Sequence, residues 1–183
     1  MNDLPHLREL FDDLRGGYHL SPEDEPVFSA VAANPEAYAA YFEPLGLKLV
    51  RHPRDFFYFE PEAGNAVSQS LPRIAVFAYI LIDHAANAGR SLEDYLFNQH
   101  FIVSRLPHLA SDRYAALLRQ MEIEGEGDLL KVLANMKNFG WVKMVGEGEF
   151  RLLRPFHRVL DKCLELSQHR LTAPEQPGPE TLP

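Results

Sequence analysis

The chain has 183 residues, of which 46% are hydrophobic and 24% charged, and its formal net charge is −8. This balance is typical of a folded globular protein, and no apolar run approaches the roughly 18–20 residues that a membrane-spanning helix needs. Phosphate contacts supply most non-specific affinity for nucleic acid, so the acidic charge disfavours a protein that binds DNA over its whole surface.

The charge is unevenly spread along the chain. Residues 1–70 carry five basic and twelve acidic side chains, whereas residues 71–170 carry thirteen basic and twelve acidic ones. A modest basic face is therefore compatible with the second half. The N-terminus has acidic residues early and no basic segment followed by an apolar core, so we expect no signal peptide and a cytoplasmic protein.

The first half predicts helices closed by a β-hairpin. Leucines at helical spacing run from Leu4 to Leu14 before a Gly-Gly pair. Ser21-Pro22 and Asn34-Pro35 each resemble the start of a helix, with an acidic first turn after Pro22. Beyond Gly46, residues 47–52 alternate, a Pro-containing turn follows, and residues 56–59 are all aromatic. Two extended segments around a short turn predict a hairpin.

The second half repeats this layout. We expect helices opening at Pro72, capped by Ser91, passing through Leu118, and capped by Asp128. Residues 141–145 and 150–153 flank a Gly-containing loop and predict a second hairpin, after which Pro155 begins a last helix. The predicted fold is mainly α with small β-hairpin wings (α+β), organised as tandem winged-helix domains. The expected boundaries are 1–66 for the N-terminal winged-helix domain, 67–170 for the C-terminal one with its closing helix, and 171–183 for a disordered Pro-rich tail.

No motif for catalysis or metal binding is present. Cys163 is the one cysteine, which excludes an internal disulfide, and we expect a buried structural thiol. The eight histidines lack zinc-site spacing, and the paired carboxylates fall in caps and loops where solvent reaches them. We therefore expect no enzyme, no cofactor, no metal, no small-molecule substrate and no membrane contact.

Two groups of residues are candidates for binding. A winged helix meets DNA through its third helix and its wing, so the candidate DNA contacts are the basic residues there: Arg51, Arg54, Lys137, Lys143, Arg151 and Arg154. The alternative is that they form the solvated face of each hairpin. The run Phe56, Phe57, Tyr58 and Phe59 offers both faces of one strand to apolar contact. One face would serve the core and the other a second domain or subunit, or both would be buried within the monomer.

The order of several short motifs resembles a known family. These are Arg15-Gly16-Gly17-Tyr18-His19-Leu20, Tyr41-Phe42, Leu49-Val50-Arg51, Phe56-Phe57-Tyr58-Phe59-Glu60-Pro61, Leu133-Ala134-Asn135-Met136, Phe139-Gly140-Trp141-Val142 and Phe150-Arg151-Leu152. Together they resemble the MukE/MksE family, accessory subunits of bacterial condensins, over nearly the whole chain up to about residue 168.

The resemblance implies more than the residues themselves predict. Members are tandem winged-helix homodimers that bind a kleisin, which bridges the heads of an SMC-type ATPase, and they hydrolyse nothing themselves. It implies a nucleoid-associated protein that meets DNA within the complex, in chromosome organisation or in plasmid defence. The alternative from another class is a dimeric winged-helix transcription regulator, which would bind a specific operator with nanomolar affinity as the isolated protein.

Overall fold

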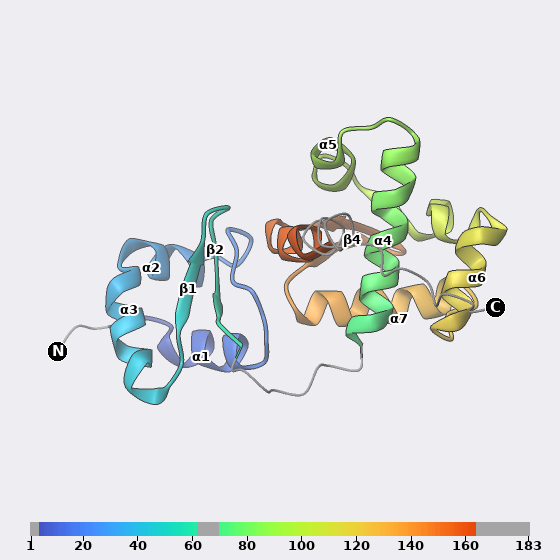
Figure 1. The fold of residues 1–183 in the computed structure, drawn as a ribbon. Helices are drawn as coiled ribbons and strands as arrows, with labels where there is room; N and C mark the ends of the chain where they lie inside the picture. The colour runs from blue at the N-terminus through green and yellow to red at the C-terminus, as the bar shows by residue number, and fades with distance from the viewer. Residues whose placement is uncertain (1–3, 62–69, 164–183) are drawn as a thin grey trace, which may run out of the picture.

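The computed structural model describes residues 4–61 and 70–163, which contain two hydrophobic clusters. One cluster is built between Leu4 and Phe59, and the other between Leu71 and Leu160. Figure 1 shows them as an N-terminal and a C-terminal body lying side by side. The predicted domain boundary at residues 66 and 67 and the predicted tail at 171–183 lie outside the described residues. The division into winged-helix domains therefore stays a prediction.

The N-terminal body packs helices against a two-stranded hairpin. Its elements are α1 (Leu7–Arg15), α2 (Val27–Ala33), α3 (Pro35–Phe42), the 3₁₀ turn η1 (Glu43–Leu45), β1 (Leu49–His52) and β2 (Phe56–Phe59). Leu10 and Leu14 of α1 are buried, as their helical spacing predicts. The strands pair antiparallel, with Arg51 opposite Phe57, so the predicted first hairpin is confirmed. Leu20 exchanges two backbone hydrogen bonds with Phe57 and extends this small sheet.

The prediction that Ser21 and Pro22 start a helix is wrong. Residues 21–25 form a turn instead, in which the Asp24 carboxylate accepts from the Ser21 backbone N–H at 2.8 Å and from the Tyr18 hydroxyl at 2.7 Å. Helix α2 begins only after Pro26, because a proline lacks the N–H group and restricts the residue before it. The acidic segment is thus left outside the helix.

The C-terminal body surrounds the long helix α4. Its elements are α4 (Leu71–Asn87), α5 (Leu92–Phe97), β3 (Phe101–Ile102), η2 (Val103–Arg105), η3 (Pro107–Leu109), α6 (Asp112–Gln120), α7 (Glu126–Asn138), β4 (Val142–Gly146), β5 (Glu149–Leu152) and η4 (Arg154–Phe156), followed by helical residues 157–163. Phe77 and Leu81 of α4 are completely buried in its core. The predicted second hairpin, β4–β5, is confirmed, and β3 adds a strand in the order β3-β5-β4. β3 was not predicted, because two residues are too few to show alternation.

Helix α7 begins three residues earlier than the Asp128 cap predicts, at Glu126 rather than Leu129. Asp128 lies inside the first turn, where its carboxylate accepts from the Glu124 backbone N–H at 3.1 Å and pairs with Lys131 at 2.8 Å. A carboxylate near a helix N-terminus is favourable whether or not it is the cap.

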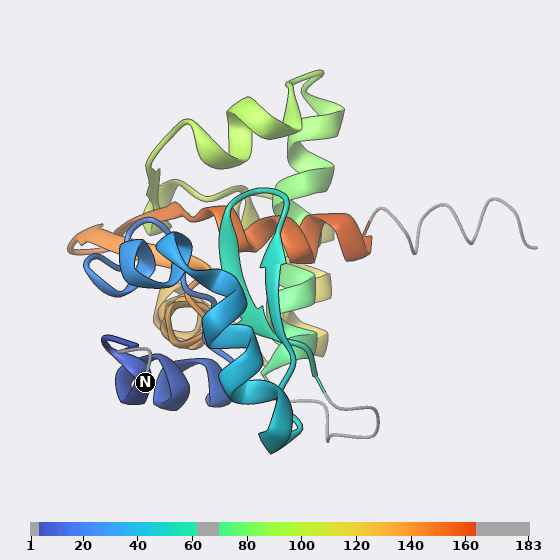
Figure 2. The same ribbon diagram turned by 90° about the vertical axis from the view of Figure 1, so that its left-hand side faces the viewer.

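The fold is mixed, with helices and small antiparallel sheets, in agreement with the predicted α+β class. In the part of the chain that the structure describes, no helix combines the length and apolarity needed to cross a membrane. Figure 2 shows the β1–β2 hairpin in front of the helical residues 157–163. The hairpin therefore faces the C-terminal body, and this junction holds most of the predicted binding residues.

Candidate nucleic-acid and partner interface at the junction

His19 joins the two bodies at the centre of the junction. The side chain is only 5% exposed, and its Nδ1 donates to the Phe139 carbonyl at the end of α7 over 2.9 Å. Its Nε2 accepts from the Arg158 guanidinium at 2.7 Å. Burial first, and then the nearby charge of Arg158, lowers the pKa of His19 to about 4. The ring is therefore neutral at pH 7. A neutral imidazole has one nitrogen that donates, here to the Phe139 carbonyl, and one that accepts, here from Arg158.

Arg158 extends this contact to the hairpin. Its guanidinium lies 3.9 Å from the centroid of the Tyr58 ring, a short cation–π distance. Burial lowers the pKa of Arg158 below its ordinary value. One side chain of the last helix thus contacts both the loop after α1 and strand β2.

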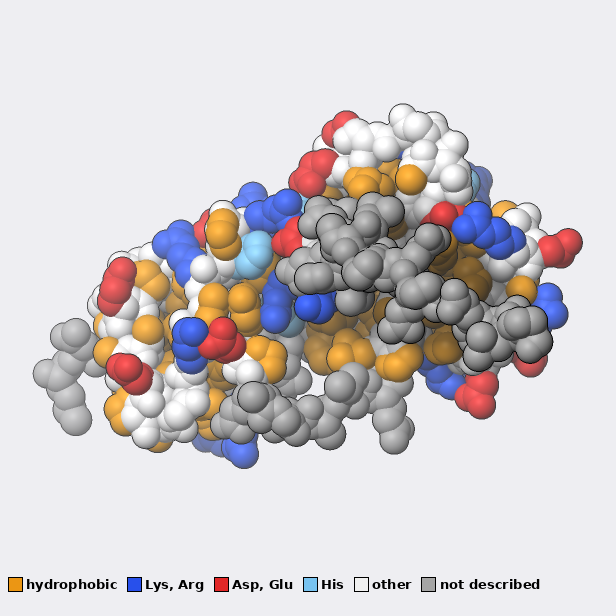
Figure 3. All heavy atoms as spheres, in the orientation of Figure 1, with side chains coloured by type: hydrophobic (Ala, Val, Ile, Leu, Met, Phe, Trp, Pro, Cys, Tyr) orange, Lys and Arg blue, Asp and Glu red, His pale blue; other side chains and the backbone are white. Residues whose placement is uncertain are grey.

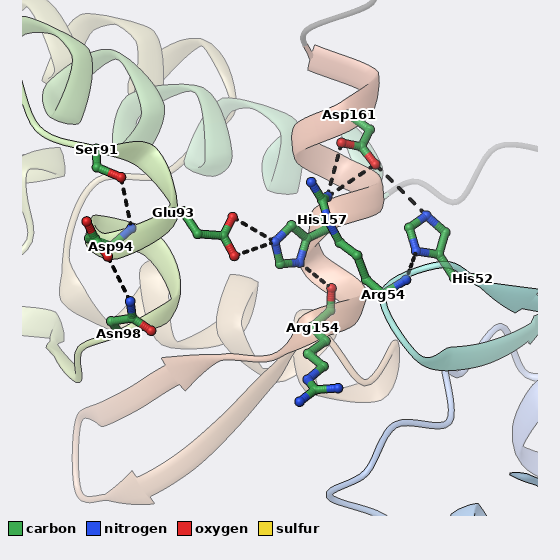
Figure 4. Close-up of polar contacts among 9 residues, drawn as sticks. All are labelled: His52, Arg54, Ser91, Glu93, Asp94, Asn98, Arg154, His157 and Asp161. Carbon is green, nitrogen blue, oxygen red and sulfur yellow. Dashed lines mark hydrogen bonds and ion pairs between the residues drawn. The ribbon is translucent and has the colours of Figure 1, made fainter.

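The tip of the β1–β2 hairpin is tied to the last helix by an ion pair. Arg54 lies 3.2 Å from the Asp161 carboxylate (Figure 4). His52 accepts at Nδ1 from the Arg54 backbone N–H at 3.2 Å and points Nε2 toward Asp161 at 4.0 Å. Burial lowers the pKa of His52, so its ring is neutral near pH 7 and the ionic contact at the tip is the Arg54 pair.

His157 fastens the same helix to α5. Figure 4 shows its ring between the Arg154 carbonyl, 2.8 Å from Nδ1, and the Glu93 carboxylate, 3.1 Å from Nε2. The ring also stacks on Phe97 with 3.7 Å between centroids. His157 thus links the residues that follow β5 to helix α5.

Two carboxylates of the N-terminal body, Glu23 and Asp55, pair with four of the predicted DNA contacts. Glu23 pairs with Lys143 of β4 at 3.0 Å and with Arg151 of β5, and the hydrogen bond from Arg151 is the chief reason that the pKa of Glu23 is lowered. Asp55 pairs with Arg51 at 2.8 Å and with Arg154 at 3.8 Å.

The predicted DNA contacts thus fall into two groups. Five of them lie at the junction and pair with a carboxylate: Arg51, Arg54, Lys143, Arg151 and Arg154. Lys137 lies apart, exposed in the last turn of α7, and makes no ion pair among residues 4–61 and 70–163. Contact of any of the six with DNA stays a prediction.

The aromatic run of β2 is divided between core and surface. Phe56 and Phe57 are completely buried within the chain, Phe57 in the N-terminal cluster and Phe56 against His52 and His19. Tyr58 and Phe59 remain partly exposed. Any contact that this run makes with a second chain would therefore use Tyr58 and Phe59.

Tyr58 and Phe59 open onto an apolar groove of about 470 Å³ between the two bodies. Its walls include Phe139 and Trp141 after α7, Ala75 of α4, and Arg158. The indole N–H of Trp141 is buried, and no hydrogen-bond acceptor in the described chain reaches it. A buried donor without a partner costs free energy, so this N–H group lowers the stability of the fold.

The described residues offer no metal-binding cluster and no activated thiol. No cluster of three or more His, Cys, Asp or Glu side chains suited to a metal ion occurs in residues 4–61 and 70–163. Cys163 is a half-buried free thiol whose pKa is raised by burial, the reverse of an activated nucleophile.

Comparison with known proteins gives the context of this junction. The family model for the condensin complex protein MksE matches residues 5–164, across both bodies and both hairpins. The chain belongs to the MksE family. The resemblance predicted from its short motifs is therefore confirmed, and MksE membership makes the chain a subunit of a condensin complex. A search of curated proteins found no match.

The residues that organise the junction were not all predicted. His19 lies in one of the motifs that carry the family resemblance, but the sequence assigns it no role. Glu23, Arg158 and Asp161 have no sequence signal, because their partners are far away along the chain.

Proposed function

We propose that this chain is a non-catalytic accessory subunit of an SMC-type condensin of the MukBEF/MksBEF kind, built from tandem winged-helix domains. It forms a homodimer, binds the kleisin and, through it, the SMC-type ATPase. In this role it assists chromosome organisation, DNA compaction or plasmid defence at the nucleoid in the cytoplasm. The observation that carries the proposal is the MksE family match over residues 5–164. Two bodies that each place helices before an antiparallel hairpin support the winged-helix part.

We place the kleisin contact in the apolar groove of about 470 Å³. Its aromatic walls suit an apolar peptide segment. Arg158 on the same wall favours an acidic residue beside that segment. The occupant that fits is therefore a kleisin segment with apolar anchors and a nearby carboxylate.

A large side chain placed on the groove wall, at a position outside the hydrophobic core, tests this contact. Ala75 is an exposed residue of α4 on the groove wall, and Ala86 is an exposed residue of the same helix that does not line it. We expect Ala75→Trp to weaken binding of the purified kleisin by about tenfold or more in calorimetric titration, because a central contact is blocked. Ala86→Trp is the matched control and should bind as the unaltered chain does.

Four results would count against the proposal. Equal kleisin affinity for both tryptophan variants would remove the groove as the contact. No kleisin binding by the unaltered chain would remove the accessory-subunit function. A monomer in sedimentation equilibrium, at 20.8 kDa rather than twice that mass, would remove the homodimer. Tight binding of the isolated protein to one DNA sequence would favour the transcription regulator instead.

A further inference from the structure

The five cations of the junction form one continuous strip, the junction strip. Arg151 and Arg154 line a common hollow of about 310 Å³ together with Glu23. Lys143 joins the strip through Glu23, and Arg51 joins it through Asp55, which also holds Arg154. Arg54 follows Arg51 at the hairpin tip. Figure 3 shows basic and acidic side chains next to one another in this region above the hairpin.

Every cation in the strip already has an anionic partner. Five cations face the three carboxylates Glu23, Asp55 and Asp161. Glu93 also lines the hollow of Arg151 and Arg154, so these five cations and four carboxylates carry a charge of +1. Four of the five are arginines, whose planar guanidinium groups bind carboxylate and phosphate oxygens with the same geometry. The carboxylates thus occupy positions that phosphate oxygens would take.

The ion pairs of Asp161 with Arg54 and of Asp55 with Arg154 are the most open to exchange, whereas the Glu23 and Arg151 side chains are only 32% and 31% exposed. The side chains of Arg54 and Asp161 are 41% and 42% exposed, and those of Arg154 and Asp55 are 57% and 39% exposed. Solvent-exposed pairs contribute little net stability, so a competing anion can replace one partner at small cost. The buried contacts of His19 with Phe139 and Arg158 do not involve these carboxylates and would keep the two bodies joined.

We propose that Glu23, Asp55 and Asp161 mask the junction strip, and that a DNA backbone binds there only by displacing them. This rests on the proposed function, in which the subunit meets DNA inside a condensin. The strip spans the tip of β1–β2 and both strands of β4–β5, so a single duplex backbone along it would contact both hairpins. Weak DNA binding by the isolated, acidic chain follows directly.

The experiment removes the mask while keeping side-chain shape. The test variant is the triple substitution Glu23→Gln, Asp55→Asn and Asp161→Asn. The matched control neutralises three carboxylates that pair with cations outside the strip, namely Asp12→Asn, Glu60→Gln and Glu122→Gln, and therefore has the same net charge. Binding of a fluorescein-labelled DNA duplex is measured by anisotropy over a series of NaCl concentrations.

We expect the test variant to bind DNA about 10–100-fold more tightly than the unaltered chain, from roughly two- to fivefold for each carboxylate removed. The slope of log affinity against log salt should steepen by about 0.9 for each new phosphate contact. The control should change affinity by less than about threefold. Adding Arg151→Gln and Arg154→Gln to the test variant should cancel most of the gain.

Several outcomes would overturn the mask. The first is equal DNA affinity for the test and control variants. The second is a gain in DNA affinity that survives loss of Arg151 and Arg154. The third is displacement of the DNA by polyglutamate at equal charge concentration, which would show that the strip binds an acidic polypeptide instead. If no variant binds DNA even at low salt, the mask is wrong. The kleisin titration would still report independently on the proposed function.

Discussion

Replacing His19 by glutamine should remove a specific part of the acid sensitivity of this protein. In the folded chain the pKa of His19 is about 4, against an ordinary value of 6.5. Between these values the unfolded chain binds more protons, so the stabilisation from the neutral ring is fully present above pH 6.5 and is lost as the pH falls toward 4. From about pH 7.5 to about pH 5 the loss amounts to about 2 kcal/mol.

Glutamine keeps a donor and an acceptor but does not titrate. The free energy of unfolding is measured in urea at about pH 7.5 and about pH 5, following the fluorescence of Trp141, the one tryptophan, whose ring lies 5.7 Å from His19. We expect His19→Gln to lose about 2 kcal/mol less than the unaltered chain on acidification. Burial also lowers the pKa of His108 to about 4, but that residue is present in both proteins and cancels.

If His19→Gln and the unaltered chain lose the same free energy, His19 does not sit as a neutral, buried link between the two bodies.

Further predictions concern packing and caps. Gly140→Ala places a Cβ atom 2.7 Å from the His19 carbonyl oxygen at φ +70°, whereas Gly148→Ala meets nothing within 4 Å at φ +66°. Backbone strain should lower the free energy of unfolding by about 1–3 kcal/mol in both variants, and the close approach should lower it by at least about 2 kcal/mol more in Gly140→Ala. Equal midpoints of thermal denaturation for the two variants would contradict the close approach. Phe57→Ala should lower the free energy of unfolding by about 3–5 kcal/mol, since the ring is completely buried, and a loss under about 1 kcal/mol in urea would contradict that burial. Ser91→Ala should cost about 1 kcal/mol by removing the α5 cap, and unchanged stability would show that the cap contributes nothing.

Local structure was largely predictable from the sequence. Both hairpins follow from alternating residues around a turn, and Ser91 caps α5 as predicted, because these signals act over a few residues. The false helix start at Ser21 shows the limit of such signals. Asp24, expected in a first helical turn, is held by the Tyr18 hydroxyl and the Ser21 backbone, and Pro26 delays the helix.

The contacts of the junction could not be predicted from the sequence, for a different reason. Its contacts join residues more than a hundred positions apart, such as Glu23 with Lys143 and Arg54 with Asp161. The basic residues were identifiable as a group, but their pairing depends on how the two bodies pack. Likewise, the aromatic run predicts a two-faced strand, but only the packing shows that Phe56 and Phe57 are buried.

The central claim is that the chain is an accessory subunit of an SMC-type condensin. Affinity capture of the tagged full-length protein from its native cells at low salt, with mass identification of co-purifying chains, tests it most directly. The account predicts stoichiometric recovery of a long coiled-coil ATPase and a kleisin-like chain. Recovery of the protein alone, together with tight binding to one DNA sequence, would contradict it.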